Sequence, residues 1–136
     1  MAYLLDTNVA IHLRDGDPNV TAKIAALDDA ILMSIVTRVE LEGGVRRDPA
    51  DAPTRRARLD AMLSGIPTLA FDDAAADAYS AIVASAGYSR RKLLDRMIAA
   101  HALVHRATLV TMNADDFNDI AGLEMRVWRT RKPTND

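Results

Sequence analysis

Short apolar segments alternate with longer amphipathic ones along the chain, and this alternation limits the choice of fold more than any other feature of the sequence. The apolar segments predict strands at 3–6, 30–36, 66–71, 107–112 and 125–128. The segments between them predict helices at about 8–13 (capped by Thr7), 20–27, 37–45, 54–63, 72–86 and 93–105. Strands that alternate with helices are typical of a parallel sheet covered by helices on both faces. We therefore expect an α/β protein with three layers, a central parallel sheet of about five strands, and a single domain over residues 1–136.

Composition excludes several classes of function. The chain has no cysteine, which rules out disulfides and thiolate chemistry and suits a cytoplasmic protein. No apolar stretch approaches the roughly 20 residues that a membrane span needs. The formal net charge is only −2, but all of the 17 basic residues except Lys23, Lys92 and Lys132 are arginine, which binds phosphate through a bidentate fork.

Polar and acidic residues follow two of the predicted strands, where the apolar segment ends. Asp6 closes the first strand, and Asn113 follows the strand at 107–112, with Asp115 and Asp116 shortly behind it. In parallel sheets flanked by helices, ligands bind outside the carboxyl ends of the strands, where the strand order reverses. Each of these residues also has a structural explanation, because Asp and Asn cap helices and acids suit the first turn of a helix. Their shared position at strand ends makes them candidates for one site.

Glu40 lies on the helix predicted for 37–45, in the segment TRVELEGG. Thr37 and Glu40 have the spacing of a capping box, which would explain Glu40 by structure alone. Gly43 and Gly44 follow on the same helix face, and each costs the helix about 1 kcal/mol relative to alanine. We therefore expect another group to approach closely beside Glu40.

Asp95 is the sharpest single candidate. In the segment LLDRMIAAHA it shares a helix face with the apolar residues Ile98, Ala99 and Ala102. A carboxylate on such a face is costly to bury unless it is paired or bound to a metal. The structural alternative is an acid favoured by the dipole at the start of its helix.

The predicted topology brings these acids to one edge of the sheet. Three or four carboxylates within a few ångströms repel one another and raise some of their pKa values. A divalent cation removes that conflict, and ligands that are all oxygen suit Mg²⁺ or Mn²⁺. His101 and His105 have the spacing of a zinc-binding pair, but His101 lies about 240° around its helix from Asp95. For both histidines we expect packing or surface roles.

Four segments of the chain resemble the PIN-domain ribonucleases in order and spacing: LLDTN, VTRVELEGG, LLDRMIAAHA and LVTMNADDF. The similarity is greatest to the VapC-type toxins of bacterial toxin–antitoxin pairs and covers essentially the whole chain. It implies a PIN-like fold and an acidic quartet that binds the metal and serves catalysis, namely Asp6, Glu40, Asp95 and Asp116. Asp115 is a possible substitute or helper in metal binding. Thr7, Thr111 and Asn113 correspond to polar residues that hold the carboxylates and the metal's waters.

The resemblance also implies an activity and partners. The activity is hydrolysis of phosphodiester bonds in RNA by an endoribonuclease that depends on Mg²⁺ or Mn²⁺, with a structured RNA such as tRNA as substrate. Basic residues would bind the phosphates, and the candidates are Arg46, Arg47, Arg90, Arg91 and Lys92. A VapB-type antitoxin would neutralise the toxin, which is expected to form a homodimer and to reach operator DNA only through the antitoxin. One departure concerns the segment before Asp95, where relatives usually have Gly and Pro and this chain has GYSRRKLLD.

Two other classes of function compete with this interpretation. A non-catalytic PIN-like module that binds a partner would be expected to lack one of the acids, and none is missing. Phosphatases with an Asp nucleophile need a second Asp two positions later, where this chain has Asn8. Receiver domains need a Lys at the end of a strand, and the strand at 107–112 offers none.

Overall fold

A five-stranded parallel sheet forms the centre of the protein in a computed structural model, which describes residues 2–129. The strands lie in the order β3-β2-β1-β4-β5, and every neighbouring pair is parallel. Their bounds are β1 (Tyr3–Leu5), β2 (Ile31–Ser34), β3 (Thr68–Leu69), β4 (Thr108–Thr111) and β5 (Met125–Val127). The predicted strands and the α/β class are confirmed.

Six α-helices connect the strands in the described part of the chain, as the alternating pattern predicted. They are α1 (Thr7–Arg14), α2 (Pro18–Ala25), α3 (Ile35–Arg47), α4 (Ala52–Gly65), α5 (Asp73–Ala86) and α6 (Leu93–Val104). A short 3₁₀ helix, η1 (Ala114–Phe117), follows β4. Gly87 ends α5 with φ of 86°, a conformation that favours glycine.

The caps of two helices differ from the sequence prediction. The N-cap of α1 is Asp6 rather than Thr7, because the Asp6 carboxylate accepts the backbone N–H of Thr7. Helix α3 begins two residues earlier than expected, because Ser34 caps it through a bond from the Val36 N–H. Thr37 therefore lies inside the first turn of α3, and the predicted capping box with Glu40 is wrong.

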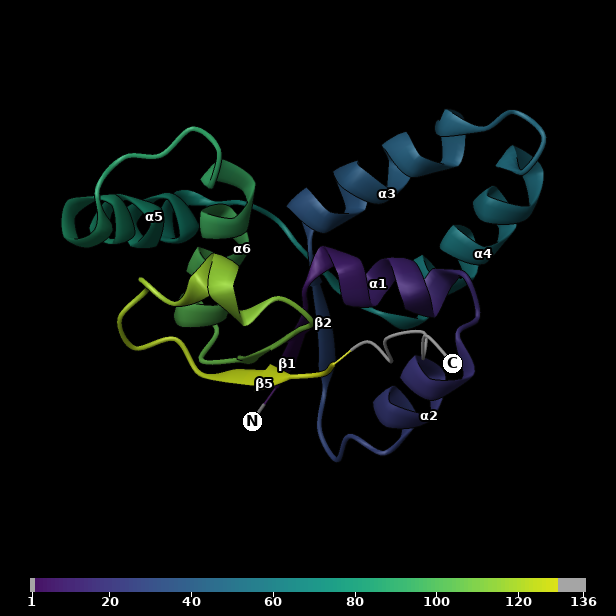
Figure 1. The fold of residues 1–136 in the computed structure, drawn as a ribbon, viewed down its shortest axis with the longest axis horizontal. Coiled ribbons are helices and arrows are strands. Elements are labelled where there is room, and N and C mark those ends of the chain that lie inside the picture. Colours follow the sequence, from purple (N-terminus) through teal and green to yellow (C-terminus); the bar gives the residue numbers. More distant parts are fainter. Residues whose placement is uncertain (1, 130–136) are drawn as a thin grey trace, which may run out of the picture.

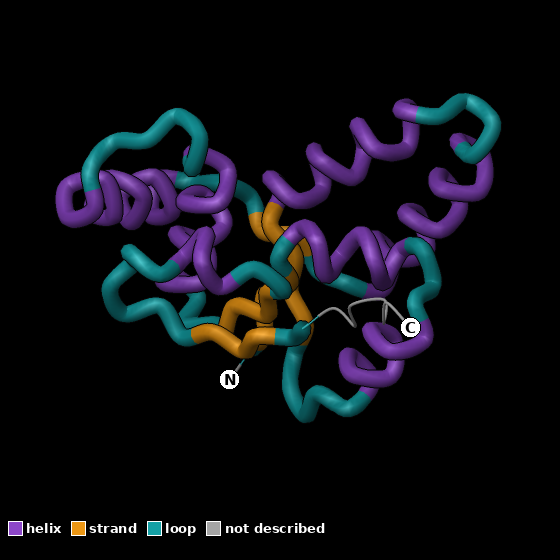
Figure 2. Tube along the Cα trace, in the orientation of Figure 1, coloured by secondary structure: helices purple, strands orange, loops and turns teal. Residues whose placement is uncertain are grey.

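Helices cover both faces of the sheet (Figures 1 and 2). Alternate residues of β1 point to opposite faces, as expected for a strand. Leu4 packs with the core residues of α5, α6 and η1, whereas Tyr3 and Leu5 pack with those of α1 and α2. A third cluster joins α1 to α3 and α4 around Met33, a residue of β2. The three-layer arrangement is confirmed.

The strand order reverses between β1 and β4, which are neighbours at the centre of the sheet. From this point the chain connections run outward in opposite directions. The carboxyl ends of β1 and β4 therefore lie side by side, where the connecting segments diverge. Asp6 and Asn113 follow these two strands. Figure 1 shows α3 and α4 forming one arm of the molecule and α5 and α6 lying on the other side of this centre. Among the described residues, no helix has the length and apolar character to cross a membrane.

Candidate active site

The Asp6 carboxylate is buried at the end of β1, with only 5% of the residue exposed. One oxygen, Oδ1, accepts the Thr7 N–H at 2.8 Å, and the other, Oδ2, accepts the Thr111 hydroxyl at 2.8 Å. Burial raises the pKa of Asp6 above its ordinary value, the bonds from Thr111 and Thr7 oppose this, and the nearby Glu40 and Asp116 raise the pKa further. Asp6 is therefore both the helix cap and part of a cluster of negative charge.

Thr7 connects Asp6 to Glu40 on α3. The Thr7 hydroxyl donates to Glu40 Oε1 at 2.8 Å and lies 3.0 Å from the Thr37 hydroxyl. A hydroxyl has one proton, so the Thr37 hydroxyl is the donor in the second bond. Sequence reasoning missed Thr37 as a site residue. The available signal was its position one turn before Glu40, which places both residues on one face of α3.

Asp116 is held on the other side of the site by the loop after β4. The Asn113 side-chain amide donates to Asp116 Oδ2 at 2.7 Å, and the Asn113 N–H donates to the Thr111 hydroxyl oxygen at 3.0 Å. Asp115 is exposed and accepts a bond from Asn118 at 3.1 Å. The structure thus brings Asp116 to the other acids, and Asp115 faces a different partner.

Asp95 joins the cluster from the first turn of α6. Burial raises the pKa of Asp95 to about 6, and the negative charges of Asp6, Asp116 and Glu40 contribute to this rise, while Lys92 opposes it. Within residues 2–129 the Asp95 carboxylate has no hydrogen-bond partner, and none of the four acids forms a salt bridge. Asp6, Glu40, Asp95 and Asp116, here called the acid site, form a concentration of negative charge, and no cation of residues 2–129 pairs with it.

The acid site offers only oxygen donors, which fit a magnesium or manganese ion. The described residues contain no group of three or more Asp, Glu, His or Cys side chains placed so that together they could hold a metal ion. Mg²⁺ commonly keeps several waters and binds through only one or two carboxylates, so it does not require such a group. The donor chemistry therefore fits this ion.

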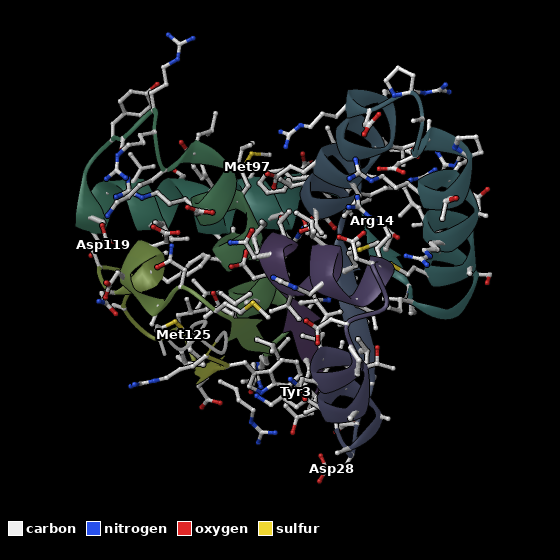
Figure 3. The ribbon with its side chains drawn as sticks, turned by 45° about the vertical axis from the view of Figure 1, so that its right-hand side comes forward. Tyr3, Arg14, Asp28, Met97, Asp119 and Met125 are labelled. Atoms are coloured by element: carbon white, nitrogen blue, oxygen red, sulfur yellow. The ribbon has the colours of Figure 1, made fainter. Side chains whose placement is uncertain are left out.

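We expected another group to approach closely at Gly43 and Gly44, and the structure shows such a group only at Gly44. A Cβ atom on Gly44 would lie 3.0 Å from the Arg14 guanidinium, whereas a Cβ on Gly43 would meet open space. Arg14 is a buried residue of α1, and Figure 3 shows it facing the α3–α4 arm. The close neighbour of Gly44 is thus a packed arginine rather than a ligand beside Glu40.

Comparison with known proteins agrees with this geometry. The PIN domain family matches residues 3–123 of the chain. The protein belongs to the PIN-domain family.

Individual relatives of this PIN-domain protein cover nearly its whole length. Ribonuclease VapC2 of Rickettsia felis is 27% identical over 135 residues, which cover 94% of this chain and 98% of the relative. The tRNA(fMet)-specific endonuclease VapC of Shigella flexneri is 30% identical over 132 residues, with the same coverage. Among solved structures, the VapBC2 complex of R. felis bound to a DNA fragment from its promoter matches with a TM-score of 0.82 and 25% identity, covering 94% of this chain and 99% of that one. The resemblance inferred from the four sequence segments is confirmed.

The five basic residues predicted to bind RNA lie on two separate parts of this PIN-domain protein. Arg46 and Arg47 are exposed at the end of α3, and Arg90 and Arg91 are exposed in the segment before α6. Figure 1 shows these two segments on opposite arms of the molecule. Lys92 is already engaged, because its Nζ lies 3.4 Å from Asp119 Oδ2.

The predicted packing role is confirmed for His101. His101 is fully buried, bonds to the Ser34 hydroxyl at 2.9 Å and the Ala70 carbonyl at 3.1 Å, and packs against Phe71. It stabilises the core and is not part of the acid site.

Proposed function

We propose that this PIN-domain protein is a VapC-type endoribonuclease toxin that hydrolyses phosphodiester bonds in RNA and is neutralised by a VapB-type antitoxin. The observation that carries the proposal is the acid site itself. Four carboxylates from four segments of the chain converge where the strand order reverses, without a salt bridge among the described residues, in a chain whose relatives are named ribonucleases.

In this proposal Asp6, Asp95 and Asp116 are the principal residues that would hold Mg²⁺ or Mn²⁺, directly or through its waters, and Glu40 would bind a second ion or orient the attacking water. When bound, such an ion supplies Lewis acidity toward the phosphate and lowers the pKa of water. The residues of the chain fix the orientation of the carboxylates. Thr111 and the Thr7 N–H hold both oxygens of Asp6, and Asn113 holds one oxygen of Asp116.

Glu40 is suited to handle a proton. Its Oε1 is fixed by the Thr7 hydroxyl, and Thr37 supports that hydroxyl in turn. Over residues 2–129 its Oε2 has no hydrogen-bond partner, so this oxygen can accept a proton from a water molecule while the side chain keeps its place.

We infer a structured RNA such as tRNA as the substrate class. Only 4% of the residues are aromatic, which leaves few side chains on which single-stranded bases could stack. Recognition through backbone and shape is the alternative, and exposed arginines at the end of α3 and before α6 suit it. The Shigella relative is named for cleavage of a tRNA.

The partners follow from the structural relatives. The R. felis structure is a VapBC complex on promoter DNA. By analogy we propose that an antitoxin covers this chain, that operator DNA is reached through the antitoxin, and that the toxin is a cytoplasmic homodimer. We further propose that residues 1–136 fold as one PIN-like domain.

The proposal is tested by incubating purified, antitoxin-free protein with total bacterial RNA in Mg²⁺, in Mn²⁺ and in EDTA, beside Asp6→Ala prepared identically. Discrete products that need metal and disappear in the variant are expected, and sequencing their ends identifies the target. Absence of cleavage by well-folded protein in both metals would contradict the proposal and favour a non-catalytic module that binds a partner.

A further inference from the structure

Asp95 reaches the acid site without hydrogen bonds of its own, so its position depends on how the first turn of α6 is held. That turn is poorly capped. Lys92 occupies the N-cap position without a side-chain cap, and its N–H reaches the Ser89 hydroxyl only at 3.3 Å. The uncapped first turn of a helix frays readily. Something other than a cap must fix Asp95.

Arg96, the residue after Asp95, supplies a firm attachment. Its side chain is only 3% exposed. The Nη1 group donates to the carbonyl of Gly87 at the end of α5, and Nη2 donates to Asp119 Oδ2 at 3.0 Å. Lys92 Nζ lies 3.4 Å from the same oxygen. Asp119 thus binds two cations that flank Asp95 in the sequence.

Asp119 belongs to the segment that carries Asp116. It lies two residues after η1, in the short segment between Phe117 and Ile120. Phe117 and Ile120 are both buried in the core cluster that includes α6. Figure 3 shows Asp119 at the edge of the molecule, between the α5–α6 pair and η1. The Arg96–Asp119 ion pair therefore joins the helix that presents Asp95 to the turn that presents Asp116.

The burial of Arg96 is not explained by stability alone. Its Nε is buried and has no hydrogen-bond partner within residues 2–129. An unpaired buried donor destabilises the folded protein. The ion pair itself adds little stability, because the Asp119 side chain is 36% exposed and ion pairs in contact with water contribute little. Because Arg96 is buried in spite of this cost, we infer that the contacts made by its guanidinium group have a role other than stability.

We propose that the Arg96–Asp119 ion pair is a positioning device that sets the separation of the Asp95 and Asp116 carboxylates and thereby the affinity of the acid site for its divalent cation. This inference rests on the proposed function. Arg96 and Asp119 contact neither RNA nor metal in this account, and they act through the two acids whose backbone segments they join.

The test is a calorimetric titration of the folded, full-length protein with Mn²⁺ at pH 7. Asp119→Asn removes the negative charge and keeps the size of a partly exposed side chain, so the fold is expected to survive. Loss of a group that orients metal ligands typically weakens metal binding by about 10- to 100-fold, and we expect a change in this range. Arg96→Lys, which keeps the charge but loses the forked geometry, should weaken binding less.

Asp60→Asn is the matched control. Asp60 pairs with Arg56 Nη2 at 2.6 Å on α4 and is not among the charges that act on the acid site. This variant should bind Mn²⁺ like the wild type. RNA cleavage as a function of Mn²⁺ supplies a second readout: Asp119→Asn should need more Mn²⁺ and recover most of its rate at saturation, which a general folding defect would not do.

Three results would overturn the inference. Wild-type affinity in Asp119→Asn, or equal weakening in Asp60→Asn, would contradict the positioning role and leave the proposed function intact. A wild-type protein that does not bind Mn²⁺ would contradict the proposed function and the inference together.

Discussion

Asp6 and Asp95 lie in the same acid site, but the protein holds them in different ways. Both oxygens of Asp6 accept hydrogen bonds, from Thr111 and from the Thr7 N–H, and the residue is nearly fully buried. Asp95 is only partly buried and has no hydrogen-bond partner in the described part of the chain. Its place is set by the packing of α6 and by the attachment of its first turn.

The Asp6 side and the Asp95 side of the acid site therefore differ in what they contribute. On the Asp6 side, a network of hydroxyls fixes carboxylate oxygens before any ligand arrives, which is the arrangement expected of a preorganised metal ligand. On the Asp95 side, negative charge is added without compensation, and the pKa of Asp95 rises to about 6 through burial and the neighbouring acids. In the proposed metal site, the Asp6 side would fix the position of the ligand oxygens, and the Asp95 side would add much of the negative charge that attracts a cation.

The largest expected effect is the loss of activity when Asp95 is neutralised. Asp95→Asn removes a proposed metal ligand, so RNA cleavage should fall by more than the roughly 100-fold that loss of a group orienting a ligand can cause. The fold should survive, because the substitution relieves repulsion from Asp6, Asp116 and Glu40. Cleavage rates and circular dichroism of the same preparation check this, and an active Asp95→Asn enzyme would remove Asp95 from the assignment.

A smaller effect is expected when the Asp6 side loses its preorganisation. Thr111→Val leaves the buried Asp6 Oδ2 without its donor, which should weaken Mn²⁺ binding by about 10- to 100-fold and lower the free energy of unfolding by about 1–3 kcal/mol. Calorimetric titration and chemical denaturation measure the two quantities. Thr21→Val, at an exposed position of α2, is the control. If Thr111→Val behaved like that control, the hydroxyl network would not orient Asp6.

The uncompensated charge predicts how stability depends on pH without metal. Asp95 binds a proton more readily in the folded chain, where its pKa is about 6, than in the unfolded chain, where it is near 3.8. The contribution of Asp95 to stability is therefore greatest below about pH 4 and is lost as the pH rises to about 6. Denaturation curves in EDTA between pH 4 and pH 8 measure this slope. Asp95→Asn should flatten it, and an unchanged slope would place the titrating group elsewhere.

The smallest effect concerns the exposed arginines. Arg91→Gln, in the segment before α6, should weaken the binding of RNA to a catalytically inactive Asp95→Asn background and reduce the slope of log affinity against log salt by about one. Arg106→Gln is the control, because Arg106 is exposed next to the amino end of β4, at the opposite edge of the sheet. Equal losses in both variants would indicate nonspecific attraction rather than a contact.

Strand ends and helix periodicity predicted Asp6, Asp95 and the pair Asp115 and Asp116, because parallel topology is encoded locally, in alternating patterns. The choice of Asp116 within that pair came from the resemblance to the PIN-domain ribonucleases. The same local reasoning misassigned Thr37. The N-cap is Ser34, because β2 ends there and its hydroxyl accepts the Val36 N–H. The Arg96–Asp119 pair could not be predicted, because 23 residues separate its two members. From the sequence alone, an arginine next to Asp95 is indistinguishable from the exposed basic residues that precede it. The neighbour of Gly44 was missed for the same reason, because Arg14 comes from another helix.

We infer that the charge of the acid site destabilises the protein until a divalent cation binds, and thermal unfolding at pH 7 measures this effect. Wild type and Asp95→Asn are unfolded side by side across a range of Mg²⁺ concentrations. We expect Asp95→Asn to have the higher Tm without metal, and Mg²⁺ to raise the Tm of the wild type much more than that of the variant. A wild-type Tm that does not respond to Mg²⁺, or the same response in both proteins, would contradict this inference.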